Sequence, residues 1–183
     1  REIIYGKRNE ILDSDSIHEQ TLNLFRNHVT DIVNDHLIET NKLSDHDYDE
    51  ILEATNENLL RTNRIALSEI KGKSPSEVID LISALVIKEY EEKLGDIPEE
   101  VRDEFEKAIT LKVIDSHWME HISTMSQLRE GIGLRGYANE NPLQAYTMEG
   151  YELFDQMLTQ INKEVSIYLM KAEIRQNLER KEV

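Results

Sequence analysis

The sequence predicts an all-α fold, and three observations carry that prediction. Apolar residues recur every three or four positions along most of the chain, which is the spacing of helix faces. The chain has three prolines, and each stands where a helix is expected to begin. Segments with the alternating, β-branched pattern of strands are nearly absent. With 183 residues, the chain is long enough for one domain, or two small ones, with a buried core.

The first three helices are expected in the first third of the chain. Residues 1–13 read as helical but begin without a capping residue, as a helix cut on its N-terminal side would. Ser16 or a neighbour can cap a second helix that runs to about Thr40, and Ser44 with Asp47 opens a third. Their apolar faces comprise Ile17, Leu24, Phe25, Val29, Ile32, His36 and Leu37, and then Tyr48, Ile51, Leu52, Thr55 and Leu59.

A better-marked helix follows an ambiguous segment at residues 65–71. Ser74 and Glu77 form a capping-box pattern around Pro75, because the serine can accept from a backbone amide while the glutamate reaches back to the cap. Gly95 then marks the end of the helix after Leu94.

Two long helices with facing apolar stripes are expected after Pro98. The glycines at 131, 133 and 136 should stop the first soon after Ile132, since each costs up to about 1 kcal/mol relative to Ala. Asn141, Pro142 and Gln144 form the start signal of the second helix. The expected antiparallel hairpin has stripes of Phe105, Ile109, Ile114, Trp118, Ile122, Met125, Leu128 and Ile132, facing Gly150, Leu153, Met157, Ile161, Val165 and Leu169.

Composition narrows the function classes. The chain carries 37 acidic and 21 basic residues, a net charge of −16. Nucleic-acid binding is disfavoured because no basic patch could neutralise phosphates. The lack of cysteine excludes disulfides and thiolate metal sites and fits a reducing compartment. No apolar run approaches the roughly 20 residues that span a bilayer, so we expect a soluble chain.

The hairpin segment resembles a known protein family. Its motif is Ile114-Asp115-x-x-Trp118-x-Glu120-His121, then Leu128-Arg129-x-Gly131-Ile132-x-Leu134-Arg135-Gly136-Tyr137-Ala138, Asn141-Pro142-Leu143 and Tyr146. This string is similar to the two-helix finger of SecA, the motor ATPase that translocates preproteins. Weaker similarity extends across nearly the whole chain.

The resemblance implies a division of the chain. Residues 1–13 correspond to the end of a long scaffold helix and residues 14–97 to the helical wing domain. Residues 98–175 correspond to the scaffold and two-helix finger with a tip at about 131–141, and residues 176–183 to a C-terminal tail. The nucleotide-binding motor has no counterpart here, so we interpret the chain as a C-terminal portion of a longer protein.

The resemblance also implies partners and site residues. Tyr137, Arg135 and Gly136 would contact the unfolded preprotein at the mouth of a SecY-type channel, while Trp118, Glu120, His121, Arg129 and Pro142 would hold the finger together. Other expected partners are the nucleotide-binding domains of the parent chain, where ATP and magnesium would bind. The expected location is the cytoplasm, peripherally at the inner face of the plasma membrane. We expect no catalytic residue, no cofactor and no metal ligand in this chain itself.

Several tip residues depart from the family pattern. Glu130, Gly133 and Glu140 stand where the family more often has glutamine, histidine and a basic residue. A more acidic and flexible tip would suit an accessory paralogue with its own substrates.

Two phosphate-binding patterns in the tip are interpreted as coincidental. Gly131, Gly133 and Gly136 match GxGxxG, but that fingerprint needs a strand before it and a helix after it. The GxxxxGK[ST] spacing fails because Tyr137 and Ala138 replace the lysine and hydroxyl residues.

A zinc-protease pattern is also present in the first long helix. His117 and His121 share one helix face in an H-x-x-E-H string, yet a catalytic zinc needs a third ligand that nothing in the sequence singles out. Packing and hydrogen bonding are favoured for both. The functional alternatives to a translocase component are an acidic helical adaptor without any link to translocation, and a zinc hydrolase using these histidines.

Two tip side chains have competing structural interpretations. Arg129 either contacts a partner or pairs with a carboxylate across the hairpin, and the sequence favours neither. An exposed contact role is favoured for Tyr137, because an aromatic residue in a glycine-flanked loop between polar helix ends has little core to enter.

Overall fold

The chain forms seven helices in the computed structural model, which describes residues 1–37, 40–61, 64–135 and 141–174. No strand occurs within these ranges, so the all-α prediction is confirmed. The helices are α1 (Glu2–Asp13), α2 (His18–Asn34), α3 (Asp45–Asn58), α4 (Leu67–Ile70), α5 (Pro75–Leu94), α6 (Glu99–Arg135) and α7 (Pro142–Lys171).

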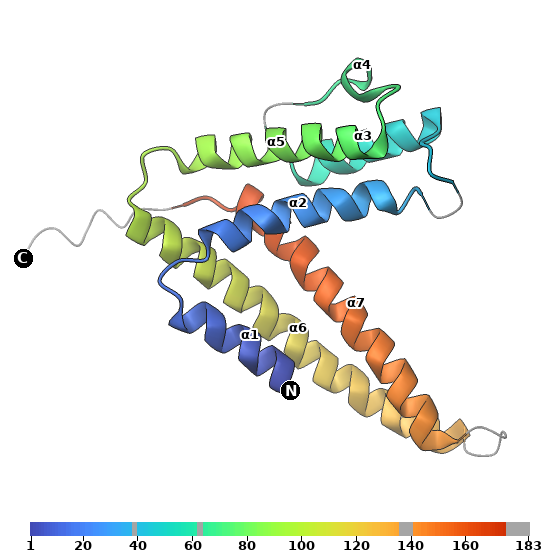
Figure 1. Cartoon of the computed structure of the whole chain (residues 1–183). Helices are drawn as coiled ribbons and strands as arrows, with labels where there is room; N and C mark the ends of the chain where they lie inside the picture. The colour runs from blue at the N-terminus through green and yellow to red at the C-terminus, as the bar shows by residue number, and fades with distance from the viewer. Residues whose placement is uncertain (38–39, 62–63, 136–140, 175–183) are drawn as a thin grey trace, which may run out of the picture.

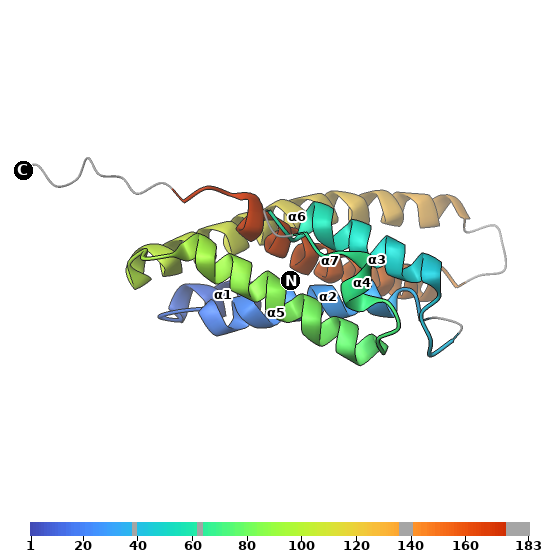
Figure 2. The same ribbon diagram turned by 90° about the horizontal axis from the view of Figure 1, so that it is seen from above.

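The two longest helices, α6 and α7, form an antiparallel hairpin that we call the finger (Figure 1). Helices α2 to α5 form a layered group, called the wing below, that crosses the open end of the hairpin (Figures 1 and 2). Helix α1 lies alongside α6. The finger therefore has a base, covered by the wing, and a distal end that extends away from the other helices.

The predicted helix starts are confirmed by their capping contacts. Ser44 Oγ accepts from the backbone N–H of Asp47 at 3.2 Å, and the Asp47 carboxylate accepts from the Ser44 N–H at 2.6 Å. Ser74 and Glu77 form the same reciprocal pair at the start of α5. Each pair satisfies amides that have no partner within the helix.

The ends of α5, α6 and α7 also follow the sequence signals. Gly95 has a φ of +52° directly after α5, a left-handed conformation that other residues adopt only with strain. Helix α6 continues three residues past Ile132, and the Asn141 side chain accepts from the backbone of Leu143 at the start of α7.

Helix α2 ends at Asn34 rather than at Thr40, so its predicted length is wrong. The amides of His36 and Leu37 bond three residues back, to Val33 O and Asn34 O. These bonds tighten the chain into turns, as often happens at helix ends. His36 is thereby placed against the first turn of α3 instead of continuing the α2 stripe.

The core runs continuously through the wing and the finger base. Burial of its apolar side chains is the main favourable contribution to folding. Its fully buried members include Ile4, Phe25, Val29, Val33, Ile51, Leu59, Ile70, Ile82, Val86, Tyr90, Leu169 and Met170.

The predicted α7 stripe is correct, and the α6 stripe contains one error. Met157, Ile161, Val165 and Leu169 are all buried, whereas Ile122 of α6 is 52% exposed. A neighbouring residue, His121, faces Phe154 of α7 instead. The predicted stripe took Ile122 because it is apolar, whereas the position that faces α7 is held by the aromatic ring of the preceding residue, His121.

Gly150 of α7 packs against the side chain of Met125 of α6. A Cβ built on this residue would lie 2.7 Å from Met125 Cε, which is shorter than real Cβ contacts. A glycine inside a helix costs up to about 1 kcal/mol relative to alanine. Here it lets α6 and α7 pack closely.

Candidate functional site

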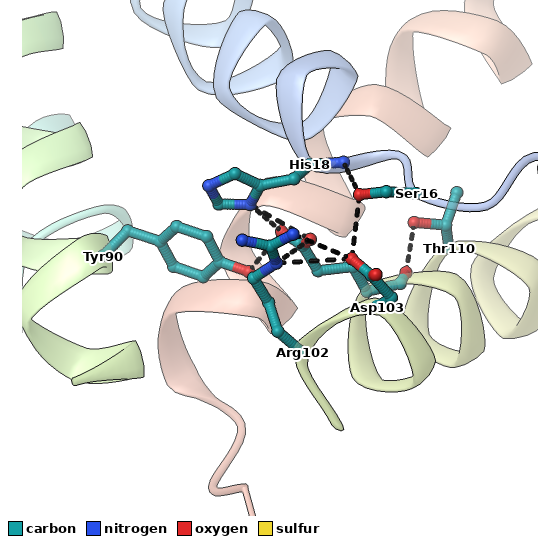
Figure 3. Close-up of polar contacts among 7 residues, drawn as sticks. Ser16, His18, Tyr90, Arg102, Asp103 and Thr110 are labelled. Atoms are coloured by element: carbon teal, nitrogen blue, oxygen red, sulfur yellow. Dashed lines mark hydrogen bonds and ion pairs between the residues drawn. The ribbon is translucent and has the colours of Figure 1, made fainter. Parts of the chain in front are cut away.

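A buried polar cluster joins the wing to the base of the finger (Figure 3). Its centre is Glu106 of α6, whose side chain is fully buried. The Tyr90 hydroxyl of α5 donates to Glu106 at 2.8 Å, and His18 Nδ1 of α2 lies 3.0 Å from the same carboxylate. Arg102 Nε is 3.8 Å away, one turn earlier on α6. One carboxylate thus connects three helices.

This cluster is energetically demanding because a carboxylate loses its hydration when buried. A buried carboxylate is stable only when hydrogen-bond donors or cations replace the water that it has lost. Burial and the neighbouring Glu106 charge both raise the pKa of Tyr90, so its hydroxyl stays protonated and donates. Removing the carboxylate would leave the Tyr90 hydroxyl without its acceptor and His18 without its carboxylate partner.

A second set of contacts extends the cluster toward the α1–α2 connection. Ser16 Oγ donates to Asp103 at 2.8 Å and accepts from the His18 amide at 3.2 Å, while Arg102 pairs with Asp103 at 3.1 Å (Figure 3). Burial alone would raise the pKa of Asp103, but the bonds from Ser16 and Arg102 outweigh it and the pKa is lowered. Ser16 was predicted as a possible cap of α2, but the N-cap residue is Ile17, which has no side-chain cap; Ser16 instead bonds the first amide of the helix and contacts α6.

A buried histidine joins α2 to α7. His28 is 5% exposed, and its Nδ1 lies 2.5 Å from Ser166 Oγ. The Ser166 hydroxyl donates its proton to Lys163 O at 2.8 Å, so His28 is the donor in the imidazole–hydroxyl bond. Burial, aided by the Lys163 charge, lowers the pKa of His28 to about 4. The imidazole is neutral at physiological pH.

Lys93 of α5 fixes the end of α7. Its ammonium donates to Leu169 O and, at 3.0 Å, to Met170 O, and it lies 5.4 Å from the centre of the Phe105 ring. A cation here neutralises the partial negative charge of a helix C-terminus. Burial and then Arg61 lower the pKa of Lys93 to about 8, partly opposed by Glu173.

Helix α1 is attached to the middle of α6. Arg8 forms a two-point ion pair with Asp115, at 2.9 and 3.2 Å. Next to it, the Tyr5 and Trp118 rings meet edge to face with centroids 6.3 Å apart. The indole also stacks on His121, which contacts Phe154 of α7.

The expected position of Trp118 is corrected by these contacts. The facing apolar stripes predicted an indole on the face of α6 that packs against α7. Trp118 is only partly buried, and His121 provides the ring contact to α7. The indole occupies the α1 side of α6, because the neighbouring stripe position already belongs to His121.

The two histidines of the zinc-protease pattern have different contacts. His117 Nε2 lies 2.5 Å from the Glu164 carboxylate of α7, whereas His121 stacks on Trp118. Burial lowers the pKa of His121. Glu120 is exposed and lines a shallow hollow with both histidines. These contacts agree with the packing and hydrogen-bonding interpretation of both side chains.

The structure describes only some of the residues predicted at or near the finger tip. Arg129 is exposed and forms no ion pair with any residue in the described ranges. Pro142 begins α7. Arg135 is the last residue of α6, while Gly136 and Tyr137 lie outside the described residues.

The glycines of the phosphate-binding pattern do not follow a strand. Gly131 and Gly133 lie within the last turns of α6, so their amides belong to a helix rather than to a strand-to-helix turn. This position supports the interpretation of GxGxxG as coincidental.

Large apolar side chains are exposed near the distal end of the finger. Leu134 and Leu143 are 81% and 73% exposed, and they flank the segment that contains Tyr137. Met148 and Tyr151 on the first turns of α7 are also exposed. Exposed apolar groups gathered in one region indicate a contact surface.

Sequence reasoning missed the polar residues that join the wing to the finger base. Glu106, His28 and Lys93 were not singled out, because a polar residue within a helix is ordinarily assigned to solvent. One signal was available for Glu106. It lies seven positions before the buried Val113, which puts both on the same helix face.

A two-helix finger fixed at its base to a wing and flanked by α1 defines a class of protein, the helical modules that position a projecting hairpin. Within the described ranges no helix is sufficiently long and apolar to cross a membrane. The family model described as the SecA wing and scaffold domain matches residues 1–173. The chain therefore belongs to the SecA family and is a component of a SecA-type protein translocase.

Proposed function

We propose that this chain is the wing and finger portion of an ATP-driven translocase, and that its finger tip contacts the translocating preprotein at a SecY-type channel. The exposed apolar side chains at the distal end, led by Leu134 and Leu143, are the observation that supports this role best. An unfolded polypeptide presents varied sequences, and an apolar surface without fixed polar partners can contact many of them. ATP hydrolysis would take place in the nucleotide-binding domains of the parent chain.

The tip residues expected from the resemblance complete the proposal. Tyr137 would supply amphipathic contact area with few rotatable bonds, which suits contact without sequence selection. Arg135 and Gly136 would shape the loop that presents it. The finger base would transmit movement of the parent motor, since its helices are joined by buried polar contacts rather than by apolar packing alone. The expected location is the inner face of the plasma membrane.

The test is site-specific photocrosslinking in the full-length translocase with a preprotein stalled during export. A photoreactive amino acid at Leu143 should crosslink to the preprotein. The matched control is the same amino acid at Glu91, an exposed residue of the wing helix α5, which should give no preprotein adduct. Adducts from Glu91 but not from Leu143 would overturn the proposal and favour an adaptor that binds through its acidic wing.

A further inference from the structure

We infer that the wing contains a transition-metal site, formed by His36, Asp47 and Glu50 and suited to Zn²⁺. The three side chains come from the turn after α2 and the first turns of α3. One ligand atom from each lies within 4.8 Å of the other two. The sequence-based expectation of no metal ligand considered only the finger histidines, and it overlooked this group because a turn separates His36 from the two carboxylates.

The spacing of the ligand atoms fits a tetrahedral ion. His36 Nδ1 lies 3.2 Å from Glu50 Oε2 and 3.5 Å from Asp47 Oδ1. Around zinc, with bonds of about 2.0–2.2 Å, neighbouring ligand atoms are about 3.3–3.6 Å apart. Only small side-chain rotations are therefore needed to place an ion between these three atoms.

The site is partly organised by its own hydrogen bonds. Asp47 Oδ2 accepts from the Ser44 backbone amide at 2.6 Å, which leaves Oδ1 directed toward His36. Groups that orient a metal ligand from behind strengthen the site.

The surrounding charge also favours a cation. Helix α3 has no lysine or arginine, and its six acidic residues are Asp45, Asp47, Asp49, Glu50, Glu53 and Glu57. His46 lies one turn before Glu50, with Nε2 3.0 Å from Glu50 Oε1, outside the group of three ligand side chains. A mixed imidazole and carboxylate set selects zinc over calcium or magnesium, which prefer oxygen ligands alone.

Isothermal titration calorimetry of the chelator-treated 183-residue chain with Zn²⁺ tests the site. One saturable site is expected, weakened at least about tenfold by Glu50→Gln, an exposed change that preserves helix propensity. Glu53→Gln is the matched control, because it removes the same charge from an exposed position of the same helix and should leave the affinity unchanged. His36→Gln should repeat the loss, with helicity by circular dichroism verifying that each variant folds.

Three results would overturn the inference. Equal weakening by Glu50→Gln and Glu53→Gln would reduce the effect to general attraction by an acidic helix. Ca²⁺ binding as tight as Zn²⁺ binding would likewise indicate general attraction of cations by the acidic helix rather than a zinc site. Zinc binding that survives Glu50→Gln and is lost in His121→Ala would place the ion on the finger helices instead.

Discussion

The base and the distal end of the finger are built from the same two helices, yet they differ in how their side chains are used. At the base, Glu106 of α6 and Ser166 and Met170 of α7 are buried and hydrogen-bonded to the wing residues Tyr90, His28 and Lys93. At the distal end, Leu134 and Leu143 are largely exposed. The contrast indicates that the base determines the position and stability of the finger, while the tip is available for contact with a partner.

The largest expected effect on the free energy of unfolding is at Glu106. Its substitution tests whether the buried contacts of the base stabilise the finger. Glu106→Ala should lower the free energy of unfolding by about 3–5 kcal/mol, because it leaves the buried Tyr90 hydroxyl without its acceptor and removes the carboxylate that contacts His18. Urea unfolding measures this change. The control, Glu104→Ala at an exposed position of the same helix, should change it by less than about 0.5 kcal/mol. A loss under about 1 kcal/mol at Glu106 would contradict the importance of the cluster.

The second expected effect is a dependence of folding stability on pH, caused by His28. The folded-state pKa of His28, about 4, lies below its unfolded value of about 6.5. The folded state therefore binds fewer protons, and stability that is present above pH 6.5 is lost as pH falls toward 4. About 2 kcal/mol should disappear between pH 7 and pH 5.

Equilibrium unfolding at several pH values provides the measurement for His28. His28→Gln should flatten the pH dependence in this window, whereas His46→Gln, at an exposed histidine, should leave the slope unchanged. An unaltered slope in His28→Gln would mean that another group carries the acid sensitivity.

A smaller effect is expected halfway along the finger, at Trp118. A fully buried tryptophan contributes about 3–5 kcal/mol, but this indole is only partly buried, so Trp118→Ala should cost about 1–2 kcal/mol. The control is Met119→Ala, because Met119 follows Trp118 directly and is 72% exposed. This substitution should hardly change the free energy of unfolding. Combining Trp118→Ala with Tyr5→Ala should give less than the summed losses if the ring contact is energetically coupled.

The same contrast separates what the sequence could and could not predict. Helix starts were predictable because capping is local, as Ser44 with Asp47 and Ser74 with Glu77 illustrate. Buried polar partners were not, since Tyr90 and Glu106 meet only after α5 and α6 have packed. The family motif predicted a tip at Tyr137, and this stays a prediction because the residue lies outside the described ranges. It did not indicate His36, whose contacts depend on where α2 ends.

The smallest effect on stability should come from Tyr137, together with the largest effect on function. Tyr137→Ala should leave the unfolding free energy within about 0.5 kcal/mol of the parent, because side chains in loops contribute little to folding. Basal ATP hydrolysis in the full-length protein should also be nearly unchanged.

Export of a cognate preprotein by the Tyr137 variants of the full-length translocase is the most direct test that the finger tip contacts the polypeptide. Tyr137→Ala should impair export, while Tyr137→Phe and Tyr137→Met should retain more activity, since contact area rather than the hydroxyl is proposed to matter. Normal export by Tyr137→Ala, or an equal loss in the Phe and Ala variants, would contradict the proposed contact.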